Sequence, residues 1–313
     1  MAKPVAKPRK TTTSEDGEKS RHYLVAGNEI EAPALPGGLY LVATPIGNLR
    51  DVTLRALETL AAADLIACED TRITRRLLEH YGIATQVTPY HEHNATEARP
   101  KIVARLASGD VVALVSDAGT PLISDPGYKL AREASAAGHL VTAIPGASSV
   151  LAALSVAGLP TDRFFFEGFL PAKETARAKR IAELIRIPAT LVLFESGPRL
   201  AASLADLAAH FGARSASICR ELTKLHEEVR RGDLAALARD YADGAETRGE
   251  IVIVIEPPDL EADDSLDVDD LLRRAMTRVS VKDAVGEVAA ATGRPRREIY
   301  QRALDLTKDG DGA

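Results

Sequence analysis

Three loops in the first half of the chain carry residue types that can hold a small polar ligand. They read Thr-Pro-Ile-Gly-Asn-Leu at 44–49, Ser-Asp-Ala-Gly-Thr-Pro-Leu-Ile-Ser-Asp-Pro-Gly at 116–127, and Pro-Gly-Ala-Ser-Ser at 145–149. Proline and glycine fix turns and let the backbone approach a ligand closely. Backbone donors and acceptors between small side chains can grip a flat, polar molecule. Each loop alone is a weak signal, because Ser148 or Ser149 is also suited to be only a helix N-cap.

A second candidate is the run His91-Glu92-His93-Asn94. Alternate histidines on a strand share one face, as metal ligands often do. The sequence offers no third and fourth ligand, so we predict no metal site. We expect His93 and Asn94 to line a substrate cleft instead.

Several familiar signatures are missing from the chain: G-x-x-x-x-G-K-[ST], G-x-G-x-x-G after the first strand, H-E-x-x-H and G-x-S-x-G. Their absence disfavours P-loop nucleotide hydrolases, dinucleotide-binding enzymes, zinc proteases and α/β-hydrolases. The three loops are therefore the main sequence evidence for a ligand site.

Short aliphatic runs, which predict buried strands, lie in the segment that holds these loops. They cover residues 39–43, 65–68, 111–115 and 140–144. They alternate with amphipathic stretches, which is typical of a largely parallel α/β sheet. Ligands bind such sheets at the carboxyl ends of the strands, where the three loops lie. Asp51 is expected to cap the helix after the first loop.

A second set of aliphatic runs predicts a second α/β domain. It begins at Phe164 and continues through 190–194, 216–219 and 251–255. Between these runs lie four apolar residues at the i, i+4, i+7, i+11 spacing of a helix packed on a sheet: Leu200, Leu204, Leu207 and Phe211. We place the two domains at 36–160 and 161–257.

The two ends of the chain differ from this body. Residues 1–35 are polar and charged, so we predict a disordered tail. Pro257-Pro258 and an acidic stretch favour a linker, and 266–313 predict three short helices. These resemble a helix-turn-helix module with a basic edge at Arg294, Arg296, Arg297 and Arg302. A helical cap on the main body is the equally open alternative.

Bulk composition limits the partners and the compartment. The net charge is −6, so contact with nucleic acid requires a local basic surface. Cys68 and Cys219 lack the spacing of a disulfide scaffold or a metal site. No apolar run approaches the roughly 18 residues of a membrane helix. We therefore expect a cytoplasmic protein without membrane contact.

Four motifs together resemble the bacterial 16S rRNA (cytidine-2′-O)-methyltransferase branch of the tetrapyrrole methylase superfamily. They are the loop 44–49, Glu-Asp-Thr-Arg at 69–72, Ser-Asp-Ala-Gly-Thr-Pro at 116–121 and Arg-Glu-Leu-Thr-Lys at 220–224. The resemblance spans roughly 38–256. It implies a two-domain α/β fold, S-adenosyl-L-methionine bound between the domains, and a homodimer. It also implies a substrate cytidine in the decoding region of 16S rRNA, within the 30S subunit.

The resemblance also assigns cofactor-binding residues, motif by motif. These are Pro45, Asp117, Ala118, Gly119, Thr120, Leu122, Ser148, Ser149, Phe194, Glu195, Leu222 and Thr223. The chain departs from the family pattern after Phe-Glu-Ser, where Gly197-Pro198 precede Arg199 in place of a proline followed by a basic residue or histidine. Contacts at 197 and 198 are therefore not carried over.

Methyl transfer to a 2′-hydroxyl requires the oxygen to be held in line with the sulfonium methyl group, and a nearby carboxylate can take the proton. Asp70, Glu221 and Lys224 belong to distant motifs of this branch, and we predict that they share the catalytic site. Lys224 would lower the pKa of the hydroxyl or contact RNA phosphate. Each carboxylate has an alternative role as the ion-pair partner of a neighbouring arginine or lysine.

Two other functions fit the same fold. A tetrapyrrole C-methyltransferase shares fold and cofactor, but the motifs at 69–72 and 220–224 and the C-terminal helical unit disfavour it. A non-catalytic RNA-binding protein is the other alternative. Methyl incorporation into porphyrin precursors would support the first, and retained cofactor binding would count against the second.

Overall fold

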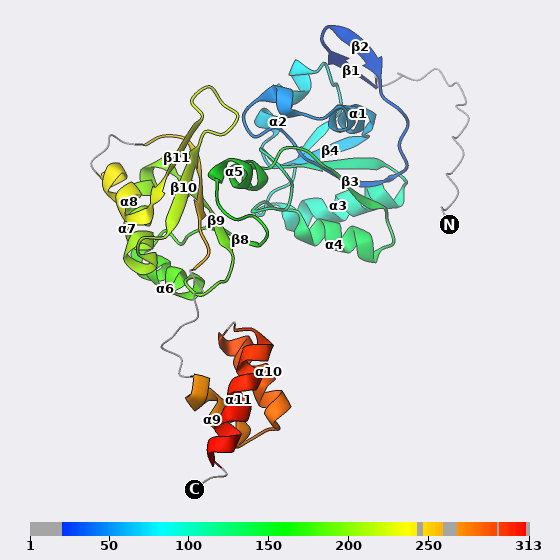
Figure 1. Ribbon diagram of the computed structural model, residues 1–313. Helices are drawn as coiled ribbons and strands as arrows, with labels where there is room; N and C mark the ends of the chain where they lie inside the picture. Colours follow the sequence, from blue (N-terminus) through cyan, green and yellow to red (C-terminus); the bar gives the residue numbers. More distant parts are fainter. Residues whose placement is uncertain (1–20, 243–246, 259–267, 293, 311–313) are drawn as a thin grey trace, which may run out of the picture.

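The computed structural model describes residues 21–242, 247–258, 268–292 and 294–310. Residues 1–20 of the predicted tail and most of the predicted linker lie outside these ranges. Two α/β units, each built on a five-stranded sheet, precede three C-terminal helices (Figure 1).

The first unit contains an all-parallel sheet with the strand order β5-β4-β6-β3-β7. Helices α1 and α2 cover one face, and α3 and α4 cover the other (Figure 1). Strands in such a three-layer arrangement are buried on both faces, which explains their continuous aliphatic runs. The elements are β3 (Gly38–Val42), η1 (Leu49–Asp51), α1 (Leu54–Ala62), β4 (Leu65–Cys68), α2 (Thr71–His80), β5 (Val87–Pro89), α3 (Ala95–Ala107), β6 (Val111–Val115), α4 (Tyr128–Ala136) and β7 (Val141–Ile144).

The predicted disordered tail is wrong at residues 22–31. Strands β1 (His22–Val25) and β2 (Asn28–Glu31) form an antiparallel hairpin. Tyr23 is buried in the core of the first unit, and the Leu24 N–H donates to the Tyr81 carbonyl at 2.8 Å. So few apolar residues cannot form a core of their own, but here they add to an existing one.

The predicted helix cap at Asp51 is also wrong. Asp51 lies in the 3₁₀ turn η1, and the N-cap of α1 is Thr53, whose hydroxyl accepts from the Ala56 N–H at 3.1 Å. Both side chains are suitable caps, and the intervening turn places the helix start two residues later.

The second unit contains a mixed sheet with the strand order β11-β10-β12-β9-β8, in which only the β8–β9 pair is parallel among the described strands. The predicted helix is confirmed as α7, which buries Leu200, Leu204, Leu207 and Phe211. The elements are β8 (Phe164–Phe169), α6 (Glu174–Leu184), β9 (Thr190–Ser196), α7 (Gly197–Phe211), β10 (Ser215–Arg220), β11 (Glu228–Asp233), α8 (Leu234–Ala242) and β12 (Glu250–Ile255).

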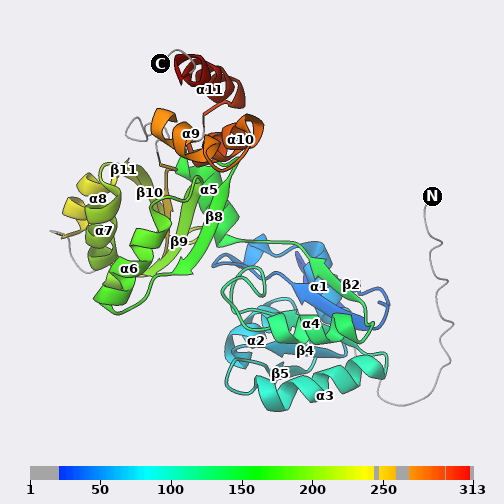
Figure 2. The ribbon, with the colours of Figure 1, turned by 90° about the horizontal axis from the view of Figure 1, so that it is seen from below.

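Helix α5 (Ser149–Ala157) links the two units. A boundary near residue 160 assigns it to the first unit, yet its buried side chains Val150, Ala153 and Leu154 pack against the second sheet. Both views place α5 on the opposite face of that sheet from α6, α7 and α8 (Figures 1 and 2). The helix therefore begins at a strand end of one unit and completes the core of the other.

The C-terminal helices are α9 (Val268–Met276), α10 (Val281–Thr292) and α11 (Arg296–Gly310). They pack on one another through a small core that includes Leu272, Val285 and Ile299. Each of the three predicted helices contributes residues to this core. No helix in the described part of the chain combines the length and apolar character needed to cross a membrane.

Candidate functional site

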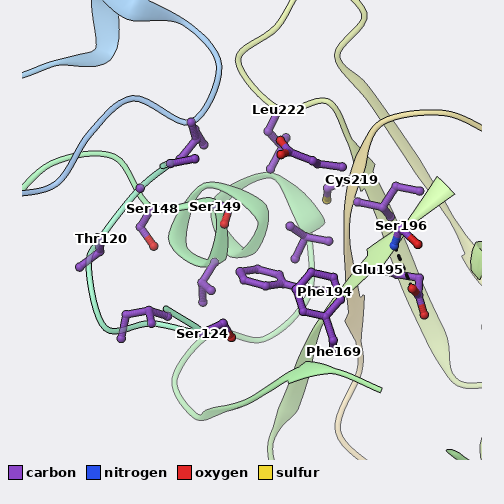
Figure 3. A pocket seen from close by; sticks show the side chains of 18 of the residues that line it. Thr120, Ser124, Ser148, Ser149, Phe169, Phe194, Glu195, Ser196, Cys219 and Leu222 are labelled. Carbon is purple, nitrogen blue, oxygen red and sulfur yellow. Dashed lines mark hydrogen bonds between the residues drawn. The ribbon is translucent and has the colours of Figure 1, made fainter. Parts of the chain in front are cut away.

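A pocket of about 260 Å³ lies between the two α/β units. Loops at the strand ends of the first unit form one side, and strands β8, β9, β10 and β12 of the second unit form the other (Figure 3). Its lining residues are Ile46, Ala118, Gly119, Thr120, Ile123, Ser124, Asp125, Ser148, Ser149, Val150, Phe169, Phe194, Glu195, Ser196, Cys219, Leu222, Gly249, Glu250, Ile251 and Val252.

Hydrogen bonds tie the first-unit loops together. Thr44 and Gly119 form a backbone bridge, with N–H to carbonyl distances of 2.9 and 3.0 Å. The Ser116 hydroxyl donates to the Gly119 carbonyl at 3.1 Å, and the Thr120 hydroxyl donates to the Ala147 carbonyl at 3.2 Å. Gly119 has a φ of +82°, in the left-handed region that favours glycine. The three loops singled out in the sequence therefore form one connected surface.

The start of α5 supplies hydroxyl groups to this surface. The Ser148 side chain accepts from the Leu151 N–H at 3.5 Å and so caps the helix, and Ser148 also lines the pocket. The cap and the pocket lining are thus two roles of one residue. Thr120, Ser148 and Ser149 lie together on one side of the pocket (Figure 3).

The second unit supplies an apolar wall. Phe169 and Phe194 meet edge to face, with ring centroids 5.5 Å apart, and the same wall continues past Cys219 to Leu222 (Figure 3). Burial raises the pKa of the Cys219 thiol to about 11, so this cysteine is an apolar wall residue and no nucleophile. A pocket with hydroxyl and backbone groups on one side and aromatic rings on the other suits a ligand with a flat ring and a polar tail.

Two contacts cross between the units at the edges of the pocket. Lys224 packs over Gly47, so closely that a Cβ at Gly47 would overlap the lysine side chain. A Cβ at Gly168 of β8 would lie 3.1 Å from the Ser124 Oγ of the first unit. Both glycines permit a close approach of backbone and side chain.

Of the residues predicted to bind the cofactor, eight line this pocket: Ala118, Gly119, Thr120, Ser148, Ser149, Phe194, Glu195 and Leu222. The pocket lining does not include Pro45, Asp117, Leu122 and Thr223. Leu122 packs into the first-unit core, and the Asp117 carboxylate accepts from the Asp70 N–H at 2.9 Å. These side chains support the loops that face the ligand space.

Glu195 is occupied by structural partners. Its carboxylate accepts from the Ser203 hydroxyl at 2.5 Å and from the Ser196 N–H at 2.8 Å, and it pairs with Arg199 at 3.3 Å. The side chain is buried against α7 because alternate residues of a strand point to opposite faces, while Phe194 points into the pocket. A Cβ at Gly197 would overlap the Thr247 backbone, which accounts for glycine at the start of α7.

The three predicted catalytic residues all lie in ion pairs, two of them with each other. Asp70 caps α2 and pairs with Arg72 at 2.6 Å, and these hydrogen bonds lower the pKa of its carboxyl to about 2. Glu221 and Lys224 pair with each other at 2.7 Å, and Lys224 pairs with Glu250 at 2.7 Å. In this structure all three side chains therefore form ion pairs, which is the alternative to a catalytic role.

Three other carboxylates gather at the strand ends of the first unit. Burial is the main cause that raises the pKa of Glu69, of Asp117 and of Asp125, and nearby anions add to it: Asp117 and Asp70 act on Glu69, Asp70 acts on Asp117, and Glu69 and Asp117 act on Asp125. Asp125 has the largest shift, to about 6, and lines the pocket. Neighbouring carboxylates in a partly buried site disfavour each other's ionisation.

The His91-Asn94 run forms a turn rather than a strand. Asn94 holds that turn, because its side chain accepts from the His91 N–H and donates to the Pro89 carbonyl, both at 2.9 Å. Neither His93 nor Asn94 lines this pocket, so their role in a separate substrate cleft stays a prediction. Within the described ranges, no group of three or more His, Cys, Asp or Glu side chains is arranged to hold a metal ion.

Twelve of the twenty residues that line the pocket were not among the predicted site residues. Ile123, Ser124 and Asp125 lie within the recognised loop 116–127, and its Asp-Pro-Gly turn at 125–127 was the available signal. Phe169 and the β12 residues Ile251 and Val252 carry no such signal, since their aliphatic and aromatic pattern is that of any buried strand.

Comparison with known families defines the class. A family model described as Tetrapyrrole (Corrin/Porphyrin) Methylases matches residues 38–238, and a model of the RsmI C-terminal HTH domain matches 262–307. Solved structures agree with this fold. A diphthine synthase superposes with a TM-score of 0.55 at 20% identity, covering 70% of this chain and 89% of its own. The cobalt precorrin-4 methyltransferase of cobalamin biosynthesis gives 0.53 at 17%, covering 70% and 94%.

Curated relatives narrow the class to one branch. A protein of Mesorhizobium japonicum is 52% identical over 293 residues, covering 92% of this chain and all of the relative. One of Pseudomonas aeruginosa is 44% identical over 274 residues, covering 86% and 97%. Both are named ribosomal RNA small subunit methyltransferase I. The chain belongs to the tetrapyrrole methylase family and, within it, to the branch of these relatives.

Proposed function

We propose that this chain is an S-adenosylmethionine-dependent methyltransferase that methylates the ribose 2′-hydroxyl of a cytidine in the decoding region of 16S rRNA. The observation that carries the proposal is the pocket between the two α/β units, formed by the motif loops of this family branch. The names of the relatives support an rRNA substrate, and the four motifs support the 2′-O position and the cytidine.

The pocket residues fit the proposed cofactor. Thr120, Ser148 and Ser149 offer hydroxyl groups to a polar tail, and Phe169 and Phe194 offer ring faces and edges to an adenine. Gly119 has no side chain, so its backbone can come close to a ligand. A Cβ there would lie 3.2 Å from the Ile46 Cγ2. When bound, the cofactor supplies a methyl group on a positively charged sulfur, whose carbon–sulfur electron pair stays on sulfur after transfer.

Contact with RNA requires a local basic surface in a chain of net charge −6. A hollow of about 590 Å³ between α10 and α11 is lined by the cations Lys282, Arg296 and Arg297 and by the half-exposed Tyr300, with the carboxylates Asp283 and Glu287 also in its lining. Cations next to an aromatic ring suit RNA phosphate and an unstacked base. In this proposal the C-terminal helices contact the RNA. The proposal also includes a homodimer that acts on the 30S subunit.

The test is to incubate the protein with labelled S-adenosylmethionine and either naked 16S rRNA or 30S particles, and to map the labelled methyl group. The expected product is one 2′-O-methylcytidine in the decoding region. Label in porphyrin precursors and none in RNA would replace the proposal by the C-methyltransferase alternative. Absence of cofactor binding in calorimetry would favour the non-catalytic alternative.

A further inference from the structure

The carboxylates of the pocket differ in the partners they already have. Glu195 is held by Ser203, Ser196 and Arg199, and Glu250 pairs with Lys224. Asp125 lines the same pocket, and the charged groups acting on it are the anions Glu69 and Asp117. Among the described residues, no cation forms an ion pair with Asp125. It is therefore a pocket carboxylate whose basic oxygens are not committed to a positive charge.

The loop that carries Asp125 has an unusual backbone. Leu122 and Ser124 are non-glycine residues with φ of +74° and +61°, and Gly127 has a φ of +131°. A Cβ at Gly127 would lie 2.6 Å from the Leu122 Cδ2. Such conformations are costly and persist where the surrounding structure imposes them, often at functional sites. Here the Leu122 side chain is packed in the core and Ser124 lies against β8, so Asp125 is held at the pocket wall between them.

Two elements set the charge around Asp125. Glu69 follows β4 and Asp117 follows β6, and both are negative when ionised. His91 acts on Glu69 in the opposite sense, and the Ser116 hydroxyl partly offsets the shift at Asp125. Burial and the neighbouring anions together raise the pKa of Asp125 to about 6. A carboxylate with a pKa near the working pH can both hold and release a proton effectively.

We propose that Asp125 is the general base that takes the proton of the ribose hydroxyl during methyl transfer. This inference rests on the proposed function. The hydroxyl proton passes to a carboxylate oxygen of Asp125, and the hydroxyl oxygen uses a lone pair for its new bond to the methyl carbon. The protonated Asp125 then returns its proton to solvent. Asp70 and Glu221 remain structural, in their pairs with Arg72 and Lys224.

The experiment compares wild type, Asp125→Asn and Asp125→Glu, with Asp162→Asn as a matched control at an exposed site. Single-turnover methylation of 30S particles, measured at saturating cofactor concentration for each variant, should fall about 10²- to 10⁴-fold in Asp125→Asn. The wild-type rate should rise with pH to a plateau above about pH 6, because only the deprotonated carboxylate accepts a proton. The amide variant should lose this dependence, and Asp125→Glu should retain it at a reduced rate.

A second readout does not depend on turnover. Carbon-13 NMR of carboxyl-labelled protein without cofactor should show a resonance that titrates near pH 6 and is missing in Asp125→Asn. Turnover of Asp125→Asn within about threefold of wild type, or an unchanged pH profile, would overturn the role of Asp125 and leave the proposed function intact. A wild type that transfers no methyl group to 16S rRNA would overturn both.

Discussion

Gly119 has a left-handed backbone conformation and also lines the pocket. Its φ of +82° strains any other residue, and a side chain there would fill space between Ile46 and Ala147. Gly119→Val should therefore abolish S-adenosylmethionine binding in calorimetry. Gly138 has nearly the same φ, +80°, with nothing within 4 Å of the position that a Cβ would take, so Gly138→Val is the matched control. Unchanged cofactor affinity in Gly119→Val would move the ligand site elsewhere.

The variant Lys224→Met tests whether the ion pair between Lys224 and Glu221 has a structural or a catalytic role. Burial lowers the pKa of its ammonium, but hydrogen bonds to Glu221 and Glu250 outweigh burial and raise it. Lys224→Met leaves Glu221 without its cation and removes the contact over Gly47. We expect a loss of about 1–3 kcal/mol in the free energy of unfolding, together with weaker cofactor binding. Normal stability with greatly reduced turnover would instead indicate a catalytic lysine.

The ion pair between Glu221 and Lys224 predicts that the free energy of unfolding depends on pH. Burial raises the pKa of Glu221, but Lys224 and the Glu250 N–H outweigh it and lower the pKa overall. A carboxyl with a lowered pKa stabilises the fold above its unfolded pKa of about 4.3, and this contribution is lost as the pH falls through the folded value. The stability difference between wild type and Lys224→Met, measured by urea unfolding, should therefore narrow from about pH 7 to about pH 3.

At the scale of elements, helix α5 follows the last strand of the first unit and packs in the core of the second unit. Leu154 of α5 is buried against the second sheet, whereas Leu151 on the same helix is 56% exposed. Leu154→Ala should cost about 2–4 kcal/mol, and Leu151→Ala should cost less than about 1 kcal/mol. Urea unfolding of the two variants measures the difference. Equal costs would mean that α5 does not complete the second core.

At the scale of the whole molecule, ligand pocket and RNA contact should be separable. The pocket lining lies entirely within residues 46–252, and the C-terminal helices pack through a core of their own. Removal of 266–313 should leave cofactor affinity unchanged and weaken binding to 16S rRNA. In the full chain, Arg296→Ala with Arg297→Ala should reduce the salt dependence of RNA affinity by roughly 0.7 per lost phosphate contact in log–log slope. Unchanged RNA affinity in the truncated protein would make these helices a structural cap.

The sequence by itself determined four of the five sheet strands and the three ligand loops of the first unit, but not β5 or the hairpin of β1 and β2. Aliphatic runs, helical spacing and Pro-Gly turns depend on neighbouring residues, so they can be read locally. Gly119, Thr120 and Ser148 were found in this way, because loops at the carboxyl ends of parallel strands must meet at one edge. The fold class and the family motifs likewise required no coordinates.

The tertiary structure alone decided which residues face one another. Strand order and pleat place Phe169, Ile251 and Val252 on the pocket side, and nothing in their own pattern distinguishes that face from the other. The tertiary structure also decides which charged groups lie near each other. Asp70 forms an ion pair with Arg72, whereas the charged groups that shift the pKa of Asp125 are both anions. Burial and charge depend on residues distant in the chain, and these are in place only after folding.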